Sequence, residues 1–557
     1  MTETMPLAGT SASPQLQSPI RHTARRVRTP VPEQVDVAII GCGLGGLQSA
    51  VRLAQAGLKV ACFDQHYVAG GCATMFERGR SGERWRFDVG LHYVGDCEPG
   101  GMIPKLLRGA GITDIQFQPM DQDGFDTLVF PGLRFRVPRG HDAYRERLLQ
   151  TFPSEKSGID RYCRFVREVG QMAGQAGTRP GLRPLLQVAL HGRMVARYRK
   201  ATVKQLLDDC TRDPLLRAVL LGESGDYGVR PSQASALLHA GLVDHYLQGA
   251  YYPVGGGQVL ADRLCERLEE LGGTIHLRRG VKRITVEDGR AVGIELEGHG
   301  GVLGPQVRAQ AVLSNADIKK TWLELLGRAH LPSEAQRRAD QWVMGGALWI
   351  SFFGVQADLH VPPGKATNYW QFDSTDVDDF YDRAERRQGY QPAGCYLTSG
   401  SQKDPQTPGH APAGCTTVEA MTLVPAAPEA WGVTAAEVES GEYRKRDAYM
   451  QAKASIEADM LRRVAALLPA TEGKVVFAES STPLTHYRFA RASGGTGYGL
   501  AATPEQFLEG RPGYRGPIPG LYQCGASTRA GHGIVGAMRS GELAAKRVAA
   551  DLGRAIP

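Results

Sequence analysis

The chain has 557 residues, of which 42% are hydrophobic and 22% charged, so it can bury a large core and is long enough for two or more domains. Its 69 glycines and 33 prolines predict many turns between short elements. The net charge of +7 is modest for this length and favours a small-molecule partner over nucleic acid, and no apolar run reaches the roughly 20 residues of a membrane span.

Ten cysteines are scattered without the paired spacing of metal ligands, which predicts neither a zinc or other metal site nor a disulfide framework. No secretory apolar segment is present, so we expect a reducing, cytoplasmic compartment. Cys42 lies inside a glycine-rich turn, where it is either a reactive thiol or, as we favour, a small residue that fits the turn.

Residues 1–34 are rich in Ser, Thr, Pro and Gln and hold few large apolar side chains, so we predict a disordered tail. An arginine-rich, acid-poor segment also suits an organelle-targeting leader, and the Arg25–Arg26 pair suits a twin-arginine signal. No apolar segment follows that pair, which favours the tail.

Residues 35–64 combine an apolar strand, a Gly-X-Gly-X-X-Gly turn, a helix, a second strand and a terminal acid, the pattern of a dinucleotide-binding βαβ unit. Gly41 and Gly43 permit a tight turn and a close approach to the pyrophosphate, and Gly46 lets the helix lie against the strand. Asp64 is placed to accept hydrogen bonds from a ribose hydroxyl, which argues against a 2′-phosphate. Such a glycine motif also occurs in ordinary loops, but the flanking elements favour nucleotide binding.

Residues 253–317 predict a helix with leucines at every fourth position, followed by three short strands. The leucines are Leu260, Leu264 and Leu268, and the strands lie around Ile275, residues 281–286 and residues 291–296.

Near the C-terminus, a strand and a glycine-rich loop lead into a helix that starts near Ile534. The N-terminus of this helix offers a second contact for a phosphate or an oxidised ring edge. We therefore predict one discontinuous nucleotide-binding domain and one substrate domain. The first takes residues 35–100, 251–340 and 476–557, and the second takes residues 101–250 and 341–475.

The second inserted segment contains a cluster of aromatic residues, which either line a cavity for an extended apolar ligand or form an ordinary sheet core. The cluster comprises Trp349, Phe352, Phe353, Tyr369, Trp370 and Phe372.

Residues 187–207 of the first inserted segment predict a helix with one basic stripe, because four cations follow a 4-3-4 spacing. The cations are Arg193, Arg197, Lys200 and Lys204. We favour a solvated basic face, which most such stripes are. The alternative is peripheral contact with an anionic membrane surface.

Taken in order, the motifs resemble the flavin-dependent phytoene desaturase, carotenoid isomerase and retinol saturase family, over nearly the whole chain after residue 34. The motifs are AIIGCGLGGLQSAVRLAQAGLKVACFDQH with the following Gly70–Gly71, RFDVGLHYVGD, YYPVGGGQVLADRL, GVKRITVEDGRAVGIEL with AVLSNAD, STPLTHYRFARASGGTGYG and GLYQCGASTRAGHGIVGAM. RFDVGLHYVGD looks most like the isomerase and saturase branch, and the C-terminal loop looks closer to the bacterial desaturases. The resemblance implies an α/β fold with α+β insertions, in which a Rossmann-like FAD-binding domain of the amine oxidase and phytoene desaturase type carries a substrate domain.

The resemblance also implies which residues hold FAD. The pyrophosphate would contact Gly41, Gly43, Leu44, Gly45 and Gly46. The adenosine ribose would contact Asp64, the flavin side would pass Gly70 and Gly71, and the adenine would meet the main chain of Val281.

The last helix and the loop before it would approach the ribityl chain and the isoalloxazine through Gly525, Gly533, Ile534 and Gly536. Many relatives carry an acid after the first of these glycines. This chain has Ala526–Ser527 there, so Ser527 is the candidate to replace that contact.

The resemblance implies an FAD-dependent oxidoreductase that acts on C=C bonds of a lipophilic polyene, carotenoid or retinoid, by desaturation, saturation or cis–trans isomerisation. The flavin supplies the hydride chemistry, with quinone, oxygen or another molecule as electron acceptor. Candidates for the one proton transfer are His92, His486 and His532, each of which is alternatively a packing residue. We prefer His92 because its motif should run beside the flavin.

Two other functions suit the same architecture. An amine oxidase could build an aromatic cage from the cluster of residues 349–372. A flavin-free carrier of lipids or prenylated partners would need no cofactor, but the intact glycine turn and Asp64 oppose it.

Overall fold

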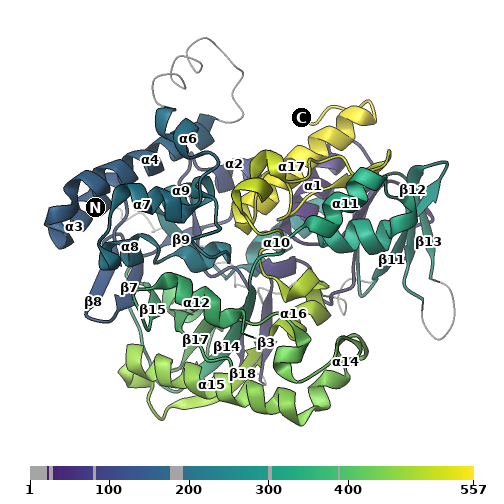
Figure 1. Cartoon of the computed structure of the whole chain (residues 1–557). Helices are drawn as coiled ribbons and strands as arrows, with labels where there is room; N and C mark the ends of the chain where they lie inside the picture. The colour runs from purple at the N-terminus through teal and green to yellow at the C-terminus, as the bar shows by residue number, and fades with distance from the viewer. Residues whose placement is uncertain (1–21, 24–28, 80–82, 176–191, 299–303, 387–388) are drawn as a thin grey trace, which may run out of the picture.

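A computed structural model describes residues 22–23, 29–79, 83–175, 192–298, 304–386 and 389–557 of the protein (Figure 1). Within these residues, two seven-stranded sheets form the framework, and two small sheets, β3–β4 and β5–β9–β6, complete it. The strands of the small sheets are β3 (Met75–Arg78), β4 (Trp85–Asp88), β5 (Val94–Gly95), β6 (Phe117–Pro119) and β9 (Ala250–Pro253).

The first large sheet has the order β10–β2–β1–β13–β12–β11, and β19 pairs with β13. Strands β10, β2, β1, β13 and β19 pair in parallel, whereas β12 is antiparallel to both of its neighbours. The strands are β1 (Gln34–Ile40), β2 (Val60–Asp64), β10 (Thr274–Leu277), β11 (Val281–Glu287), β12 (Arg290–Leu296), β13 (Gln306–Ser314) and β19 (Leu521–Gln523). Three parts of the chain that are far apart in sequence therefore share one sheet.

Helices α1 (Leu44–Gln55), α10 (Gln258–Glu270) and α17 (Gly533–Asp551) pack on this sheet, and α1 lies against α17 (Figure 1). The two helices approach closely because a Cβ on Gly541 would lie only 2.2 Å from the carbonyl oxygen of Gly45. The hydroxyl of Ser49 donates to the carbonyl of Gly541 at 3.0 Å across the same contact. Glycine at this crossing thus sets the distance between the first and last helices.

The elements expected from local pattern are confirmed. The βαβ unit spans β1, α1 and β2, and the three short strands are β10, β11 and β12. The leucines at every fourth position of α10, Leu260, Leu264 and Leu268, are fully buried, and α17 begins at Gly533, next to the expected start.

The second large sheet has the order β18–β14–β17–β16–β15–β7–β8 and is antiparallel except between β15 and β7. Its strands are β7 (Asp126–Phe130), β8 (Leu133–Val137), β14 (Ala347–Val355), β15 (Asn368–Phe372), β16 (Gly394–Thr398), β17 (Thr416–Val424) and β18 (Val475–Ser481). β17 is buried along its whole length, which agrees with its place between two other strands.

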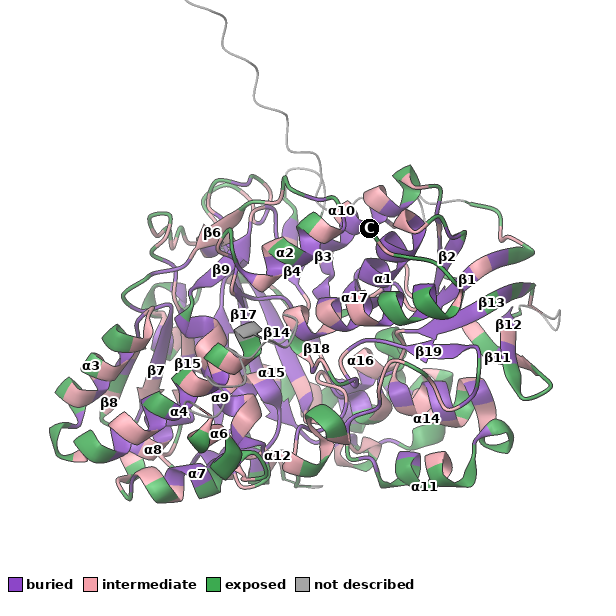
Figure 2. Ribbon diagram, turned by 90° about the horizontal axis from the view of Figure 1, so that it is seen from above, coloured by how far each residue is buried: buried purple, intermediate pink, exposed green. Residues whose placement is uncertain are grey.

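Helices surround this second sheet, and their outward faces are exposed while most of the strands are buried (Figure 2). The helices are α3 (His141–Thr151), α4 (Lys156–Gln175), α6 (Arg193–Tyr198), α7 (Val203–Cys210), α8 (Pro214–Leu220), α9 (Ala236–Leu247), α12 (Val377–Ala384), α13 (Gly400–Lys403), α14 (Ala435–Ser440), α15 (Asp447–Leu467) and α16 (Pro483–Ala490). Helices α2 (Met102–Gly109) and α11 (Ser333–Gln341) lie with the first sheet, where α2 contacts α17 and α11 packs on the segment after β13.

The single basic helix expected over residues 187–207 is wrong. Residues 187–191 lie outside the described residues, and the rest forms two helices, α6 and α7, because Thr202 caps α7 in a reciprocal capping box with Gln205. Arg197 pairs with Asp209 at 2.7 Å in this region, so the cations do not form one free stripe.

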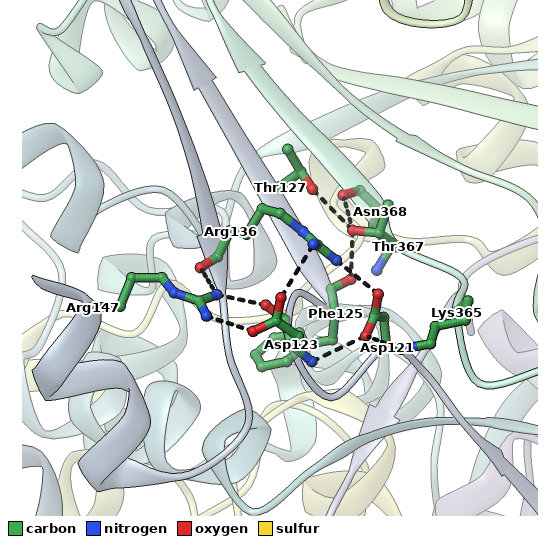
Figure 3. A network of polar contacts seen from close by, with 9 residues as sticks. All are labelled: Asp121, Asp123, Phe125, Thr127, Arg136, Arg147, Lys365, Thr367 and Asn368. Atoms are coloured by element: carbon green, nitrogen blue, oxygen red, sulfur yellow. Dashed lines mark hydrogen bonds and ion pairs between the residues drawn. The ribbon is translucent and has the colours of Figure 1, made fainter. Parts of the chain in front are cut away.

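A polar network holds the start of β7 against the neighbouring strands (Figure 3). Arg136 Nη2 donates to Asp121 Oδ2 at 2.7 Å, and Lys365 lies 3.5 Å from the other oxygen of the same carboxylate. The hydroxyls of Thr127 and Thr367 lie 3.1 Å apart and join β7 to the chain entering β15. The network fixes the register of β7. This strand contains a buried acid that lies near the site described below.

Most of the predicted tail falls outside the described residues. His22, which is described, is buried, and its backbone amide donates to Asp262 Oδ1 of α10 at 3.1 Å. Among the described helices, none combines the length and apolarity that crossing a membrane requires.

Candidate functional site

A cavity of about 1230 Å³ is lined by residues of both large sheets. One wall comes from the β1–α1 turn, the end of β2, the segment after it and the loop before α17. The other wall comes from β14, β15, β16 and β17 of the second sheet and from α9. The cavity therefore connects the predicted nucleotide positions with the interior of the other sheet.

The glycines of the β1–α1 turn close around Asn315, which sequence reasoning did not select. A Cβ on Gly43 would lie 2.7 Å from Asn315 Nδ2, and a Cβ on Gly45 would lie 2.6 Å from Asn315 Oδ1. Gly41 has φ +95°, and its turn packs on the backbone of the same asparagine. The only signal for Asn315 in the sequence is its place directly after β13, in the AVLSNAD motif.

The N-terminus of α1 is free of a side-chain cap, because the residue in the N-cap position is Gly43. Amide groups at such a helix end stabilise an anion. The turn thus has the form of a phosphate cradle whose volume a Cβ would fill.

Asp64 lies at the end of β2 and faces the cavity. Its Oδ2 accepts from the backbone amide of Cys42 at 2.7 Å, and its Oδ1 accepts from the amide of His66 at 2.8 Å. These contacts fix the carboxylate beside the turn. Cys42 itself is fully buried and its pKa is raised, which fits a packing residue and not a reactive thiol.

Gly70 and Gly71 run against the β1–α1 turn. The amide of Gly70 donates to the carbonyl of Cys42 at 2.8 Å, and a Cβ on Gly71 would lie 3.0 Å from Gly43 Cα. Both glycines have positive φ, +128° and +61°, which larger residues rarely adopt. The second glycine segment can follow the first only because side chains are absent from both.

The loop before α17 reaches the same asparagine from the other side. Gly525 has φ +94°, and its Cβ would lie 2.8 Å from Asn315 Oδ1. The hydroxyl of Ser527 accepts from the amide of Leu500 at 3.1 Å, so this side chain also ties the loop to the neighbouring segment.

All but one of the predicted FAD positions line the cavity. They are Gly41, Gly43, Leu44, Gly45, Asp64, Gly70, Gly71, Val281, Gly525, Ser527, Gly533, Ile534 and Gly536. Gly46 does not line it. Its Cβ would lie 2.2 Å from the carbonyl oxygen of Gly41, so this glycine faces the turn and lets α1 pack against β1. The roles of these residues toward FAD stay a prediction.

The three candidate histidines also line the cavity, in different states. Burial lowers the pKa of His92 to about 3, with a further contribution from the Lys403 charge, and neither ring nitrogen has a hydrogen-bond partner among the residues that the structure describes. Burial likewise lowers the pKa of His532 to about 3. These two rings are neutral near pH 7 and are poor proton donors there, although the role of His92 in catalysis stays a prediction.

His486 instead pairs with Cys72, with 3.6 Å between its Nε2 and the sulfur. The thiol follows the second glycine segment and is open to the cavity. Burial alone would raise the pKa of Cys72, but the hydrogen bond and the charge of His486 together outweigh burial and lower it. Burial would lower the pKa of His486, but its hydrogen bond and charge interaction with Cys72, with smaller contributions from Gly495 and Asp317, raise it. Both shifts favour the charged forms of the pair.

We expect iodoacetamide to alkylate Cys72 before the other nine cysteines at pH 7, because no other cysteine is exposed. Replacing His486 with alanine should slow this alkylation roughly tenfold by restoring an ordinary thiol pKa. A peptide mass-spectrometry time course checks both expectations, with the exposed His330→Ala as control. First modification at any other cysteine would contradict them.

The aromatic cluster divides between the two faces of the second sheet. Part of it lines a cavity, and part of it forms an ordinary sheet core. Phe352 and Trp370 line the cavity. Trp349 and Phe353 are fully buried on the other face, where Trp349 stacks on Trp431. The alternation follows from the two-residue repeat of a strand, which sends neighbouring side chains to opposite faces.

A buried polar layer lies behind His92. Lys403 Nζ donates to the carbonyl of His92 and to Thr398 Oγ1, and the charge lies over the ring of Tyr252 at 4.7 Å. Burial raises the pKa of Glu419, close to this cation, to about 8, and within the described part of the chain neither of its carboxyl oxygens has a hydrogen-bond partner. Nothing in the local sequence marks this layer as part of a site.

Comparison with known proteins gives a family and a fold. The model of the family described as flavin containing amine oxidoreductase matches residues 44–384. A solved structure, cyclohexylamine oxidase from Brevibacterium oxydans, superposes with a TM-score of 0.56 and 17% identity, over 93% of this chain and all of that one. The likeness confirms the predicted fold class.

Two curated relatives match over most of their length. All-trans-retinol 13,14-reductase of Macaca fascicularis is 30% identical over 93% of this chain and 86% of its own. Prolycopene isomerase 1 of an Oncidium hybrid cultivar, a chloroplastic protein, is 25% identical over 94% of this chain and 85% of its own.

Proposed function

This chain belongs to the family of flavin-containing amine oxidoreductases, and on that premise we propose that it is an FAD-dependent oxidoreductase acting on C=C bonds of a lipophilic polyene. The retinol reductase and the prolycopene isomerase support this choice, because their names specify C=C chemistry on polyenes and they match nearly the whole chain. The amine oxidase likeness is limited to 17% identity and supports the fold alone.

The observation that carries the proposal is the continuity of the cavity. The same space is lined by the glycine cradle around Asn315 and by Phe352, Trp370 and Leu348 of the second sheet. Its lining also includes Leu237, Leu238 and Leu242 of α9, which present apolar side chains. An extended apolar ligand in this part of the cavity would reach the cofactor without crossing solvent.

The residues present fit FAD. The uncapped end of α1 and the glycines around it would hold the pyrophosphate, and Asp64 would accept from the adenosine ribose. Val281 would meet the adenine, and the loop from Gly525 to the start of α17 would meet the flavin end. When bound, the flavin supplies hydride transfer at carbon. The apolar wall would orient the polyene and exclude water.

The discontinuous domain division is part of this proposal. Residues 35–100, 251–340 and 476–557 would bind FAD, and residues 101–250 and 341–475 would bind the polyene. The mixed origin of the first sheet, with strands from residues 34–64, 274–314 and 521–523, supports this division.

The proposal is tested by purifying the protein, measuring its flavin spectrum and mixing it anaerobically with retinoids and carotenoids. Bleaching of oxidised flavin indicates desaturation, oxidation of pre-reduced flavin indicates saturation, and a changed polyene spectrum at constant flavin indicates isomerisation. A colourless protein that FAD cannot reconstitute would contradict the proposal. Reaction with amines alone would favour an amine oxidase, and tight lipid binding without flavin would favour a carrier.

A further inference from the structure

Three acidic side chains lie together where η3 (Ser224–Tyr227), β7 and β15 meet the cavity. Asp126 is fully buried and Glu223 nearly so, whereas Asp226 is half-buried and lines the cavity. The phenol of Tyr93, which also lines the cavity, lies between two of them. Its oxygen is 3.1 Å from Asp126 Oδ2 and 2.8 Å from Asp226 Oδ2.

The hydrogen bonds require an extra proton in this cluster. A phenol has one hydrogen and can donate it to only one carboxylate. The second short contact therefore needs a hydrogen on a carboxyl group, because two ionised carboxylates would leave it without any. One of Asp126 and Asp226 is thus protonated.

Neighbouring donors decide which acid carries the proton. Asp126 accepts from Asn368 Nδ2 at 2.8 Å and from Trp370 Nε1 at 3.0 Å. The orientation of that amide is fixed because Thr398 donates to Asn368 Oδ1 at 2.7 Å, and the same hydroxyl accepts from Lys403. A chain of donors that begins at a cation therefore ends on Asp126 and stabilises its ionised form.

The proton consequently lies on Asp226, the acid that faces the cavity. With the proton there, the hydroxyl of Tyr93, which lies within hydrogen-bond distance of both carboxyl groups, would donate to Asp126 and accept from Asp226. The pKa values of the two acids agree with this assignment, because the pKa of Asp226 is the higher one. Burial raises that of Asp226 to about 7 and that of Asp126 to about 6, the latter held lower by its amide and indole donors.

The other titratable groups around the cluster leave this assignment unchanged. They are Glu223, Tyr246, Tyr396, Tyr498, His532 and Lys403. Burial raises the pKa of Glu223 and favours its neutral form, and the four ring systems are neutral near pH 7. A hydrogen bond from Tyr246 holds the pKa of Asp226 lower than burial alone would, yet that pKa stays above the one of Asp126. The charge of Lys403 acts on Asp126.

The loop that carries Asp226 also touches the segment assigned to the flavin end. The hydroxyl of Tyr498 donates to the carbonyl of Gly225 at 2.6 Å, and its ring packs edge-on against His532 at 5.9 Å. His532 is the N-cap residue of α17. The carboxyl group thus lies on the cavity wall next to the loop that would approach the isoalloxazine.

We propose that Asp226 is the proton donor in saturation of the polyene, with Tyr93 and Asp126 as positioning residues. The inference rests on the proposed function. One carbon of the C=C bond receives a hydride, and with it two electrons, from reduced flavin, which becomes oxidised. The other carbon receives the proton of Asp226, so the π bond breaks, two C–H bonds form, and the carboxylate regains its proton from water.

The first test uses the protein without polyene. Infrared spectra of the oxidised flavoprotein should contain the C=O bands of protonated carboxyl groups at pH 6, and one component should fade as the pH rises through 7. That component should be missing from Asp226→Asn and kept in the neighbouring Glu223→Gln, whereas the bands of other protonated acids, such as Glu419, remain in Asp226→Asn. A wild-type spectrum without a component that fades near pH 7, or an Asp226→Asn spectrum that keeps it, overturns the shared proton.

The second test mixes pre-reduced enzyme anaerobically with all-trans-retinol in a single turnover. The wild-type rate should fall tenfold per pH unit above about 7, because only protonated Asp226 can donate. Asp226→Asn should lower the rate by a factor of about 10² to 10⁴ and remove this pH dependence. Asp226→Glu should restore part of the rate and part of the pH dependence. Glu223→Gln should keep the wild-type rate and pH dependence.

The two tests separate failure of the inference from failure of the proposed function. If no polyene oxidises the reduced flavin, saturation fails and the catalytic role of Asp226 fails with it. The proposed function fails only if, in addition, no polyene bleaches the oxidised flavin or changes its own spectrum. If polyene is saturated and Asp226→Asn keeps its rate and pH profile, only the inference fails. Flavin content of each variant confirms that it folds.

Discussion

Flavin binding is expected to weaken about 100-fold or more when alanine replaces Gly46. The new Cβ would lie 2.2 Å from the carbonyl oxygen of Gly41 and 3.2 Å from Asn315 Cβ. Neither atom can rotate away, since one belongs to the backbone and the other is fixed to it. Helix α1 would therefore move off β1 and carry the cradle out of place, and 100-fold corresponds to about 2.7 kcal/mol.

Flavin absorbance of the purified protein and titration of stripped protein with FAD measure this effect. Gly109→Ala in α2 is the matched control, because the nearest atom to its Cβ, Arg52 Cζ, is 3.9 Å away. Equal flavin content in the two variants would mean that the close packing of α1 on the turn does not govern binding.

Replacing Lys403 with methionine should lower the free energy of unfolding by about 3 kcal/mol. The substitution keeps much of the volume but removes the donor to the carbonyl of His92 and to Thr398. It also removes the cation beside Glu419 and Asp88, two buried acids whose pKa values depend on it. Buried acceptors and acids without a counter-charge carry the full desolvation cost.

Denaturant unfolding compares this variant with Lys365→Met, because the side chain of Lys365 is 59% exposed and its ammonium pairs with Asp121 at 3.5 Å. Replacing the exposed lysine should change the free energy of unfolding by less than about 1 kcal/mol. Adding Glu419→Gln to Lys403→Met should recover part of the loss. Equal effects of the two lysine variants would refute a special role for the buried cation.

The part of the fold that could be predicted is the part encoded locally. The strand, turn and helix of residues 35–64 lie within one short window, and so do α10 and the strands after it. The basic segment of residues 187–207 was wrongly predicted as one helix, although the sequence signal that divides it is also local. Thr202 and Gln205 have the spacing of a capping box, which marks the start of a new helix.

The site was only half predictable for a physical reason. Glycines indicate a close backbone approach because they lack a side chain, so the glycine positions of the site could be predicted from the sequence. Tyr93, Asp126 and Asp226 are an ordinary tyrosine and two ordinary acids until folding brings them together across 33 and 133 residues. Asn315 is equally unremarkable until the glycines of the β1–α1 turn and Gly525 close around it.

The contact between α1 and α17 has a consequence for the order of events during synthesis. β19, the Gly525 loop and α17 follow every other described strand and helix in the chain, yet they complete the wall around Asn315. While residues 521–551 are still untranslated or inside the ribosome, the βαβ unit lacks one neighbour of its cradle. If the cradle holds the cofactor as proposed, loading is a late step, which the nascent chain cannot complete before this last segment has emerged and docked.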